Sequence, residues 1–221
     1  MVQIRTRAVE VPATLYANDV ELEAVDRLVV RMYALVANGI TGATDALLGG
    51  DRALARTVVA ADLDIDALQH ELEAIVERRL VDERLRTPSE VRFLISVLRI
   101  APELERSGDL IEHIAVRTPQ RLIADVSPRT RGLLQGMGHA ALALWLRAAD
   151  VYVERDPAGL DELRQLDDQL DDLHVELTEE LARGSMPVSV AIELGLIARF
   201  YERLGDHAVN VTGRIACGDD A

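Results

Sequence analysis

The sequence predicts an all-α protein made of two tandem, antiparallel three-helix bundles, and three observations lead to that prediction. Capping residues and prolines divide the 221 residues into six helical segments. Within these segments, apolar residues recur with the 3.6-residue period of an amphipathic helix. The second half of the chain also repeats the order of helices and several acidic positions of the first half.

Helix-capping residues place the beginnings of the first three helices. Asn18 and Glu21 form the pattern of an N-cap with its reciprocal side-chain partner. Asp51 follows two glycines that end the first helix, and it begins the second. Thr87 is a good N-cap, and Pro88 after it suits the first helical turn. These signals predict helices over residues 19–48, 51–86 and 88–117.

Similar signals place the last three helices. Ser127-Pro128 and Asp156-Pro157 each combine a capping side chain with a proline at the first helical position. A glycine and a proline in the run 184–187 end one helix and begin the next. The predicted helices cover residues 128–155, 157–183 and 187–216.

The six segments group into two units of three helices. Matching apolar stripes run from Leu94 to Ala115 and from Leu194 to Val211. Aromatic residues make up only 3% of the chain, so the cores are expected to be the aliphatic seams of helical bundles. We therefore expect a first bundle over residues 18–118, a second over 127–217, and an N-terminal arm over 1–17.

The most specific repeated feature is a pair of carboxylates four residues apart. Glu105 and Asp109 in the third helix recur as Glu202 and Asp206 in the sixth, 97 positions later (202 − 105). Residues i and i+4 lie on one face of a helix, so each pair presents two carboxylates together. The second and fifth helices carry a matching pair at an offset of 105 (167 − 62), namely Asp62 and Asp66, then Asp167 and Asp171.

Antiparallel hairpins bring these pairs to the same level. Residues equidistant from the turn lie side by side when the two helices of a hairpin are antiparallel. The acids of the first unit pair about the midpoint 85.5, just before Thr87, and those of the second about 186.5, inside the run 184–187. Each unit is therefore expected to hold four carboxylates on two adjacent helices.

Four ionised carboxylates at one level repel one another. They can take up protons at a raised pKa, pair with Arg106 and Arg203, or bind a cation. Oxygen donors suit hard cations such as Mg²⁺, Ca²⁺, Mn²⁺ or iron, and suit zinc less well. Gly108 and Gly205, three residues after each glutamate, would allow close approach of a neighbouring helix or a ligand. We predict metal ligands at Asp62, Asp66, Glu105, Asp109, Asp167, Asp171, Glu202 and Asp206.

Other residues near the motifs differ between the two units. His70 and His113 extend the acidic faces of the first unit by one turn, but Val175 and Asn210 replace them in the second. The repeat therefore does not support these histidines as ligands. Pro102 lies inside the third helix and is expected to kink or restart it.

The charge of the chain limits its partners. The net charge is −14, from 38 acidic and 24 basic residues, which argues against binding nucleic acid or an anionic membrane. It fits a protein that binds cations or docks on basic protein surfaces. A single cysteine, Cys217, suits a reducing compartment, and no segment has the pattern of a signal peptide or a membrane span. We therefore expect a cytoplasmic protein.

The residues around the second motif resemble a known family. The run Tyr201-Glu202-Arg203-Leu204-Gly205-Asp206-His207 is very close to the signature of the PhoU family of phosphate-uptake regulators. The first motif is a looser copy, with Ser107 where an aliphatic residue is usual, so the second motif is the more orthodox of the two. The resemblance covers about residues 19–216 and implies tandem, spectrin-like three-helix bundles with metal clusters at the eight carboxylates given above.

The resemblance also implies a function. PhoU proteins are non-enzymatic negative regulators of the phosphate-starvation response that act between the ATPase of the phosphate ABC transporter and a sensor histidine kinase. The implied cofactors are metal ions (Fe, Mn, Mg or Zn), and a homodimer is compatible with the resemblance. Two alternatives stay open, a metal-dependent hydrolase that uses the carboxylate clusters and a metal-free helical scaffold. The sequence has no GxSxG elbow, phosphate-binding glycine loop or HExxH motif in favour of the hydrolase.

Overall fold

The described residues of the computed structural model are 20–82, 87–118, 122–124, 126–156, 158–184 and 186–216. They form six helices and no strand, which confirms the all-α prediction. None of these helices is long and apolar enough to cross a membrane. The predicted N-terminal arm over residues 1–17 lies outside the described residues. The helices are α1 (Val20–Gly49), α2 (Arg52–Val81), α3 (Pro88–Ala115), α4 (Pro128–Glu154), α5 (Gly159–Ala182) and α6 (Val188–Ala216).

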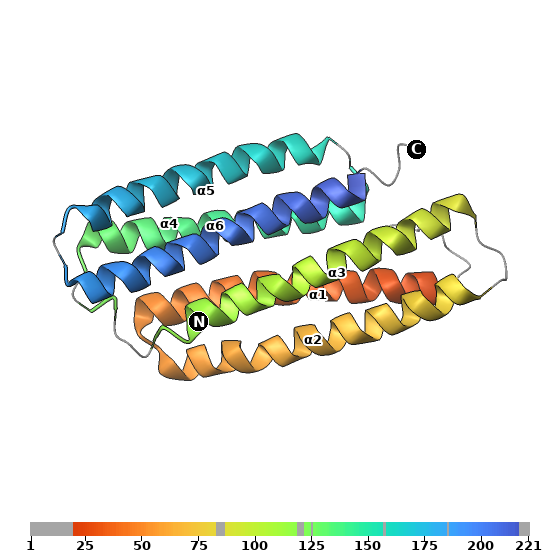
Figure 1. Ribbon diagram of the computed structural model, residues 1–221, viewed down its shortest axis with the longest axis horizontal. Coiled ribbons are helices and arrows are strands. Elements are labelled where there is room, and N and C mark those ends of the chain that lie inside the picture. The colour runs from red at the N-terminus through yellow and green to blue at the C-terminus, as the bar shows by residue number, and fades with distance from the viewer. Residues whose placement is uncertain are drawn as a thin grey trace.

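The helices form the two predicted three-helix bundles, which lie side by side (Figure 1). α1, α2 and α3 contact one another, and so do α4, α5 and α6. α1 also packs on α4, and α3 packs on α6, so these four helices form the contact between the bundles. α2 and α5 lie on the two opposite outer sides of the molecule (Figure 1).

One continuous apolar core runs through both bundles. It is mostly aliphatic, but three buried aromatic rings lie where α1 meets α4. The ring of Tyr33 lies 5.9 Å from that of Trp145 and 5.7 Å from that of Tyr152, measured between centroids. Trp145 also donates a hydrogen bond of 3.0 Å from Nε1 to the carbonyl oxygen of Leu204 on α6. Because these rings join residues of both bundles, the two bundles are packed as one body.

A buried ion pair also crosses the contact between the bundles. Asp26 on α1 is only 3% exposed. Its Oδ1 accepts hydrogen bonds from the Tyr152 hydroxyl at 2.5 Å and from Arg155 Nη2 at 2.9 Å. Arg155 follows α4 in the left-handed conformation (φ 53°), and its guanidinium lies over the rings of Phe93 and Tyr152. These contacts hold a non-glycine residue in a backbone conformation that is otherwise rare.

A second buried polar contact joins α3 to α6. Glu103 is 6% exposed and forms an ion pair of 3.0 Å with Arg214. The Ser107 hydroxyl donates to the carbonyl oxygen of Glu103 at 2.6 Å and lies 3.0 Å from His207 Nδ1. The only proton of the hydroxyl is used in its bond to Glu103, so its oxygen must accept the second hydrogen bond. The donor is then the N–H group at Nδ1 of the His207 ring. Ser107 thus has a structural role at the position where the PhoU signature has an aliphatic residue.

The predicted N-caps of three helices are confirmed. The Thr87 hydroxyl accepts a hydrogen bond of 3.2 Å from the N–H of Glu90, and the Ser127 hydroxyl accepts one of 3.0 Å from the N–H of Thr130. Asp51 caps α2 by accepting two backbone N–H groups of its first turn. These side chains satisfy N–H groups that have no partner within the helix.

Two predictions about helix ends were wrong, and one of the two outcomes expected at Pro102 does not occur. α2 ends at Val81 rather than at residue 86, because Asp82 turns the backbone to an extended conformation (ψ 120°). Asp156 does not cap α5, which begins at Gly159; its carboxylate accepts from the N–H of Ala158 instead. α3 does not restart at Pro102 but continues through it. A proline inside a helix removes one hydrogen bond, and the packing of α3 on three other helices compensates for that loss.

Candidate metal sites

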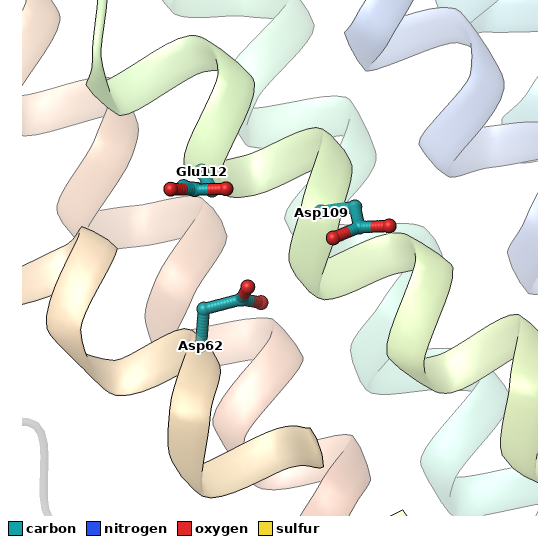
Figure 2. A group of neighbouring side chains, drawn as sticks. All are labelled: Asp62, Asp109 and Glu112. Carbon is teal, nitrogen blue, oxygen red and sulfur yellow. The ribbon is translucent and has the colours of Figure 1, made fainter.

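The acidic faces of α2 and α3 meet in the first bundle. Asp62 on α2 lies opposite Asp109 and Glu112 on α3 (Figure 2). One carboxylate oxygen from each of these three residues lies within 4.8 Å of the other two. Asp66 and Glu105 lie close enough that the charges of Asp109 and Asp66 raise the pKa of Glu105. The structure therefore brings Asp62 and Asp109 together with Glu112, whereas Asp66 and Glu105 lie within electrostatic range but outside this group.

An aspartate of the neighbouring helix packs against each of the two motif glycines, at the same distance in both units. A Cβ atom at Gly108 would lie 2.5 Å from Asp62 Oδ1, and one at Gly205 would lie 2.5 Å from Asp167 Oδ1. The predicted close approach of a neighbouring helix is therefore present at both glycines. The aspartate oxygen occupies the space that a larger side chain would take, which is why the motif needs glycine at this position.

We expect alanine at Gly205 to destabilise the protein. The added methyl group would contact Asp167 and also lie 2.8 Å from Leu170 Cδ2. Overpacking costs about 1–3 kcal/mol, and alanine gains about 1 kcal/mol in helix propensity. The net effect of Gly205→Ala should be a free energy of unfolding about 1 kcal/mol lower than that of wild type. Gly132→Ala is the matched control in open space on α4, and it should be neutral or stabilising. Urea unfolding monitored by circular dichroism measures both, and a Gly205→Ala protein more stable than wild type would contradict this account.

Burial and mutual repulsion change the acidity of the first cluster. Partial burial, followed by the charges of Asp66, Asp109, Glu112 and Glu105, raises the pKa of Asp62 to about 6. Glu105 also has a raised pKa, mainly because it is partly buried and secondly because Asp109 is near. Both directions are those expected for partly buried carboxylates that lie close to other negative charges.

The second cluster, in α5 and α6, behaves similarly. Partial burial and the charges of Asp171 and Asp206 raise the pKa of Asp167 to about 6. Burial and the charge of Asp206 also raise the pKa of Asp171 and of Glu202. The charges of all four predicted acids act on one another, so these acids lie within electrostatic range in the second unit too.

The two clusters differ in detail, and the first is the tighter one. Glu202 forms an ion pair with Arg199, which neutralises part of the second cluster. The repeat places Val209 where the first unit has Glu112, so the second unit lacks that carboxylate. Within the described parts of the chain, only the first cluster has three donor atoms within 4.8 Å of one another.

Both clusters contain buried carboxylate oxygens without a partner. Asp62 Oδ1 and Glu202 Oε2 are inaccessible to solvent and accept no hydrogen bond. Buried polar atoms are usually paired, so such oxygens indicate a site for a positive partner. Oxygen donors from two helices fit a hard cation, which would remove the repulsion within each cluster.

Sequence reasoning missed two residues near the clusters. Glu112 follows Asp109 by three positions, and this i, i+3 spacing on one helix face was the available signal. His174 follows Asp171 by three, and its positive charge, when protonated, opposes the raised pKa of Asp171 and Glu202. Arg106, suggested as a partner of the first cluster, forms its ion pair with Glu103 instead.

His70 and His113, which the repeat does not support as ligands, are exposed. The Nδ1 atom of His70 hydrogen-bonds the carbonyl oxygen of Asp66 in its own helix at 2.7 Å. His113 packs edge-on against the ring of Phe200, with centroids 5.4 Å apart. Neither belongs to the group of donors around Asp62.

Comparison with known proteins identifies the family. The family model described as "PhoU domain" matches residues 29–118 and again residues 134–215. A PhoU homologue of the phosphate-specific transport system in Zymomonas mobilis is 31% identical over 93% of this chain and 87% of its own length. PhoU homologue 1 of Mycobacterium tuberculosis is 34% identical over 83% of this chain and 84% of its own length.

Solved structures show the same fold. The crystal structure of PhoU from Pseudomonas aeruginosa has a TM-score of 0.81 and 26% identity, covering 88% of this chain and 95% of that one. PhoU from Streptococcus pneumoniae also has a TM-score of 0.81, with 23% identity over 90% of this chain and 95% of that one, and it supports the fold alone. With both repeats matched by the family model and relatives above 30% identity along most of its length, the chain belongs to the PhoU family.

Proposed function

We propose that this protein is a non-enzymatic, cytoplasmic regulator of phosphate uptake that lowers the phosphate-starvation response. It docks on the ATPase of the phosphate ABC transporter and on the associated sensor histidine kinase, and it binds metal ions at its two carboxylate clusters. The observation that carries the proposal is family membership, because the relatives above are named as accessory proteins of phosphate-specific transport. The acidic surface, with a net charge of −14, supports docking on basic protein surfaces.

The carboxylate clusters support the metal-binding part of the proposal. Asp62, Asp109 and Glu112, with Asp66 and Glu105 beside them, would hold a cation in the first unit. In the second unit the ligands would come from Asp167, Asp171, Glu202 and Asp206. The oxygen donors favour Mg²⁺ or Mn²⁺, with iron as a further candidate, and zinc would gain only the nearby His174. A bound cation supplies positive charge between an outer and an inner helix of each bundle.

Metal affinity should rise with pH. Carboxylates must be deprotonated to act as full ligands, and the pKa of Asp62 and Asp167 is raised to about 6. Mn²⁺ binding measured by isothermal titration calorimetry should therefore be several-fold tighter at about pH 7.5 than at about pH 5.5. Asp62→Asn with Asp109→Asn should abolish binding in the first unit, whereas Asp64→Asn, on an exposed face of α2, should leave it unchanged. Equal affinity in the double variant and in wild type would remove these residues from the ligand set.

Binding to the proposed partners tests the function itself. The full-length protein should bind the purified transporter ATPase and the cytoplasmic part of the sensor kinase in pull-down and interferometry experiments, with and without Mn²⁺. Expression of a phosphate-starvation reporter should rise when the gene is deleted and fall when it is restored. If neither partner binds and the reporter is unchanged, the regulatory function is wrong for this chain.

A further inference from the structure

A groove of about 200 Å³ opens beside the first carboxylate cluster, between α1 and α2. Its walls are mainly apolar, and Asp62 lies at its edge together with Gly108 of α3. The groove therefore combines an apolar channel with a carboxylate whose Oδ1 is buried and accepts no hydrogen bond. The main wall residues are Leu35, Gly39, Gly42, Val58, Ile65 and Ile111.

Two glycines on one face of α1 form the floor of the groove. A Cβ atom at Gly42 would lie 2.8 Å from Val58 Cγ2, and one at Gly39 would lie 3.1 Å from Ile111 Cγ2. Each glycine inside a helix costs roughly 0.5–1 kcal/mol relative to alanine. Facing α2 and α3, the two glycines let the side chains of Val58 and Ile111 pack directly against the backbone of α1.

In the second bundle, the positions that correspond to these two glycines carry side chains. At the offset of 105, Leu144 corresponds to Gly39 and Arg147 corresponds to Gly42. Leu144 Cδ1 lies 3.3 Å from the Cβ position of Gly205, next to the second cluster. Arg147 forms ion pairs of 2.7 Å with Glu162 and 3.2 Å with Asp156. The second unit therefore has an aliphatic side chain and an arginine at these two positions, and the arginine pairs with acids outside the second cluster.

In the first unit, side chains from other helices pack near Gly39 and Gly42 instead. Ile111 stands where the second unit has Ala208, and it contacts Gly39 in place of the missing leucine. At Gly42, Val58 Cγ2 lies 2.8 Å from the Cβ position, and the first unit has no basic side chain at that position. Asp62, Asp109 and Glu112 form no ion pair with any arginine or histidine among residues 20–82, 87–118 and the other described segments. The groove is thus complementary in charge and shape to a basic side chain with an apolar stem.

We propose that this groove receives an arginine side chain of a partner protein, with its methylene stem between α1 and α2 and its guanidinium on Asp62. This inference rests on the docking function proposed above and names the surface that carries it. Arginine fits better than lysine, because its planar guanidinium binds a carboxylate through two hydrogen bonds and is more weakly hydrated. Its stem can cover apolar surface while the charged end reaches the acid. Because Asp62 is also a proposed metal ligand, cation binding and docking should compete.

A small probe tests the groove without any partner. Butylguanidinium carries the stem and the charged group of arginine, and guanidinium chloride at the same concentration is the matched probe without the stem. In ¹H–¹⁵N spectra of the full-length, metal-free protein, butylguanidinium should shift the amide signals of Gly39, Gly42 and Gly108 saturably, whereas guanidinium should not. Asp62→Asn should weaken this binding at least tenfold, and Asp64→Asn should not. Absence of saturable shifts, or equal binding by Asp62→Asn, would overturn the proposal.

Binding of the proposed partners tests whether a protein supplies the arginine. Gly42→Arg gives the first unit the residue that the second unit already has, and it should lower affinity for the transporter ATPase or the sensor kinase at least tenfold. Gly132→Arg, placed where nothing lies within 4 Å of the Cβ position, is the matched control. If Gly42→Arg folds and binds both partners as wild type does, the groove is not the docking surface, although the regulatory function stands. If wild type binds neither partner, the regulatory function fails, and the butylguanidinium titration alone decides the chemistry of the groove.

Discussion

Replacing Arg155 with alanine should lower the free energy of unfolding by roughly 3–5 kcal/mol. The side chain of Asp26 is only 4% exposed, and without Arg155 its charge would remain buried with the Tyr152 hydroxyl as its hydrogen-bond donor. Loss of the contacts with the rings of Phe93 and Tyr152 adds to the cost. Since whole domains are stable by about 5–15 kcal/mol, this single change removes a large share of the stability.

Two further variants show whether the buried charge is the cause. Arg164→Ala removes an exposed arginine that pairs with Asp161 at 2.9 Å, and its effect should stay within about 1 kcal/mol. Asp26→Asn combined with Arg155→Ala removes the unpaired charge and should recover part of the stability lost in Arg155→Ala. Chemical denaturation of the three proteins provides the measurement. A loss below about 1 kcal/mol in Arg155→Ala would mean that the ion pair contributes little to the contact between the bundles.

The second large effect concerns pH. Without added metal, the protein should become less stable as the pH rises from about 4 to about 6. Asp62 and Asp167 have a pKa of about 6 in the folded protein and an ordinary value of 3.8, so in this window the folded state binds more protons than the unfolded state. Stability attributable to these two groups is therefore fully present below their unfolded pKa and is lost as the pH rises through the folded pKa.

The size of this pH effect is limited by solvent. A pKa shift of about two units corresponds to roughly 3 kcal/mol per group, but both side chains are partly exposed, so about 1–2 kcal/mol each is the realistic effect. Asp62→Asn with Asp167→Asn should remove it, and the difference between wild type and this variant isolates the two groups from all other acids. Mn²⁺ at about 100 times its dissociation constant should restore about 2.7 kcal/mol per site at neutral pH in wild type only. Identical pH profiles for the two proteins would contradict the prediction.

The sequence alone was enough to predict the helices and which acids of neighbouring helices face one another. Both features depend on local periodicity and on the symmetry of a hairpin. Thr87 and Ser127 cap their helices as expected, and in each unit the four predicted acids lie within electrostatic range of one another. The motif glycines were expected to allow close approach, and the structure places Asp62 and Asp167 against them. Because the same residue pattern occurs in both halves of the chain, each half supports the prediction made for the other.

The features that were missed depend on contacts between helices that are distant in the sequence. The pairing of Asp26 with Arg155 joins residues 129 positions apart, and no periodicity indicates it. The closely spaced donors of the first cluster depend on Glu112, which has no acidic counterpart in the second unit.

The position of α2 and α5 has a consequence for the whole molecule. Each of these outer helices buries six of its residues, whereas α1 buries 13 and α3 buries 14. We therefore expect α2 and α5 to need less free energy to detach than the inner helices, because they bury fewer residues. Each carboxylate cluster lies between one of these outer helices and an inner helix. Repulsion within a cluster favours detachment of the outer helix, so we expect protonation or a bound cation to make local opening of α2 and α5 rarer.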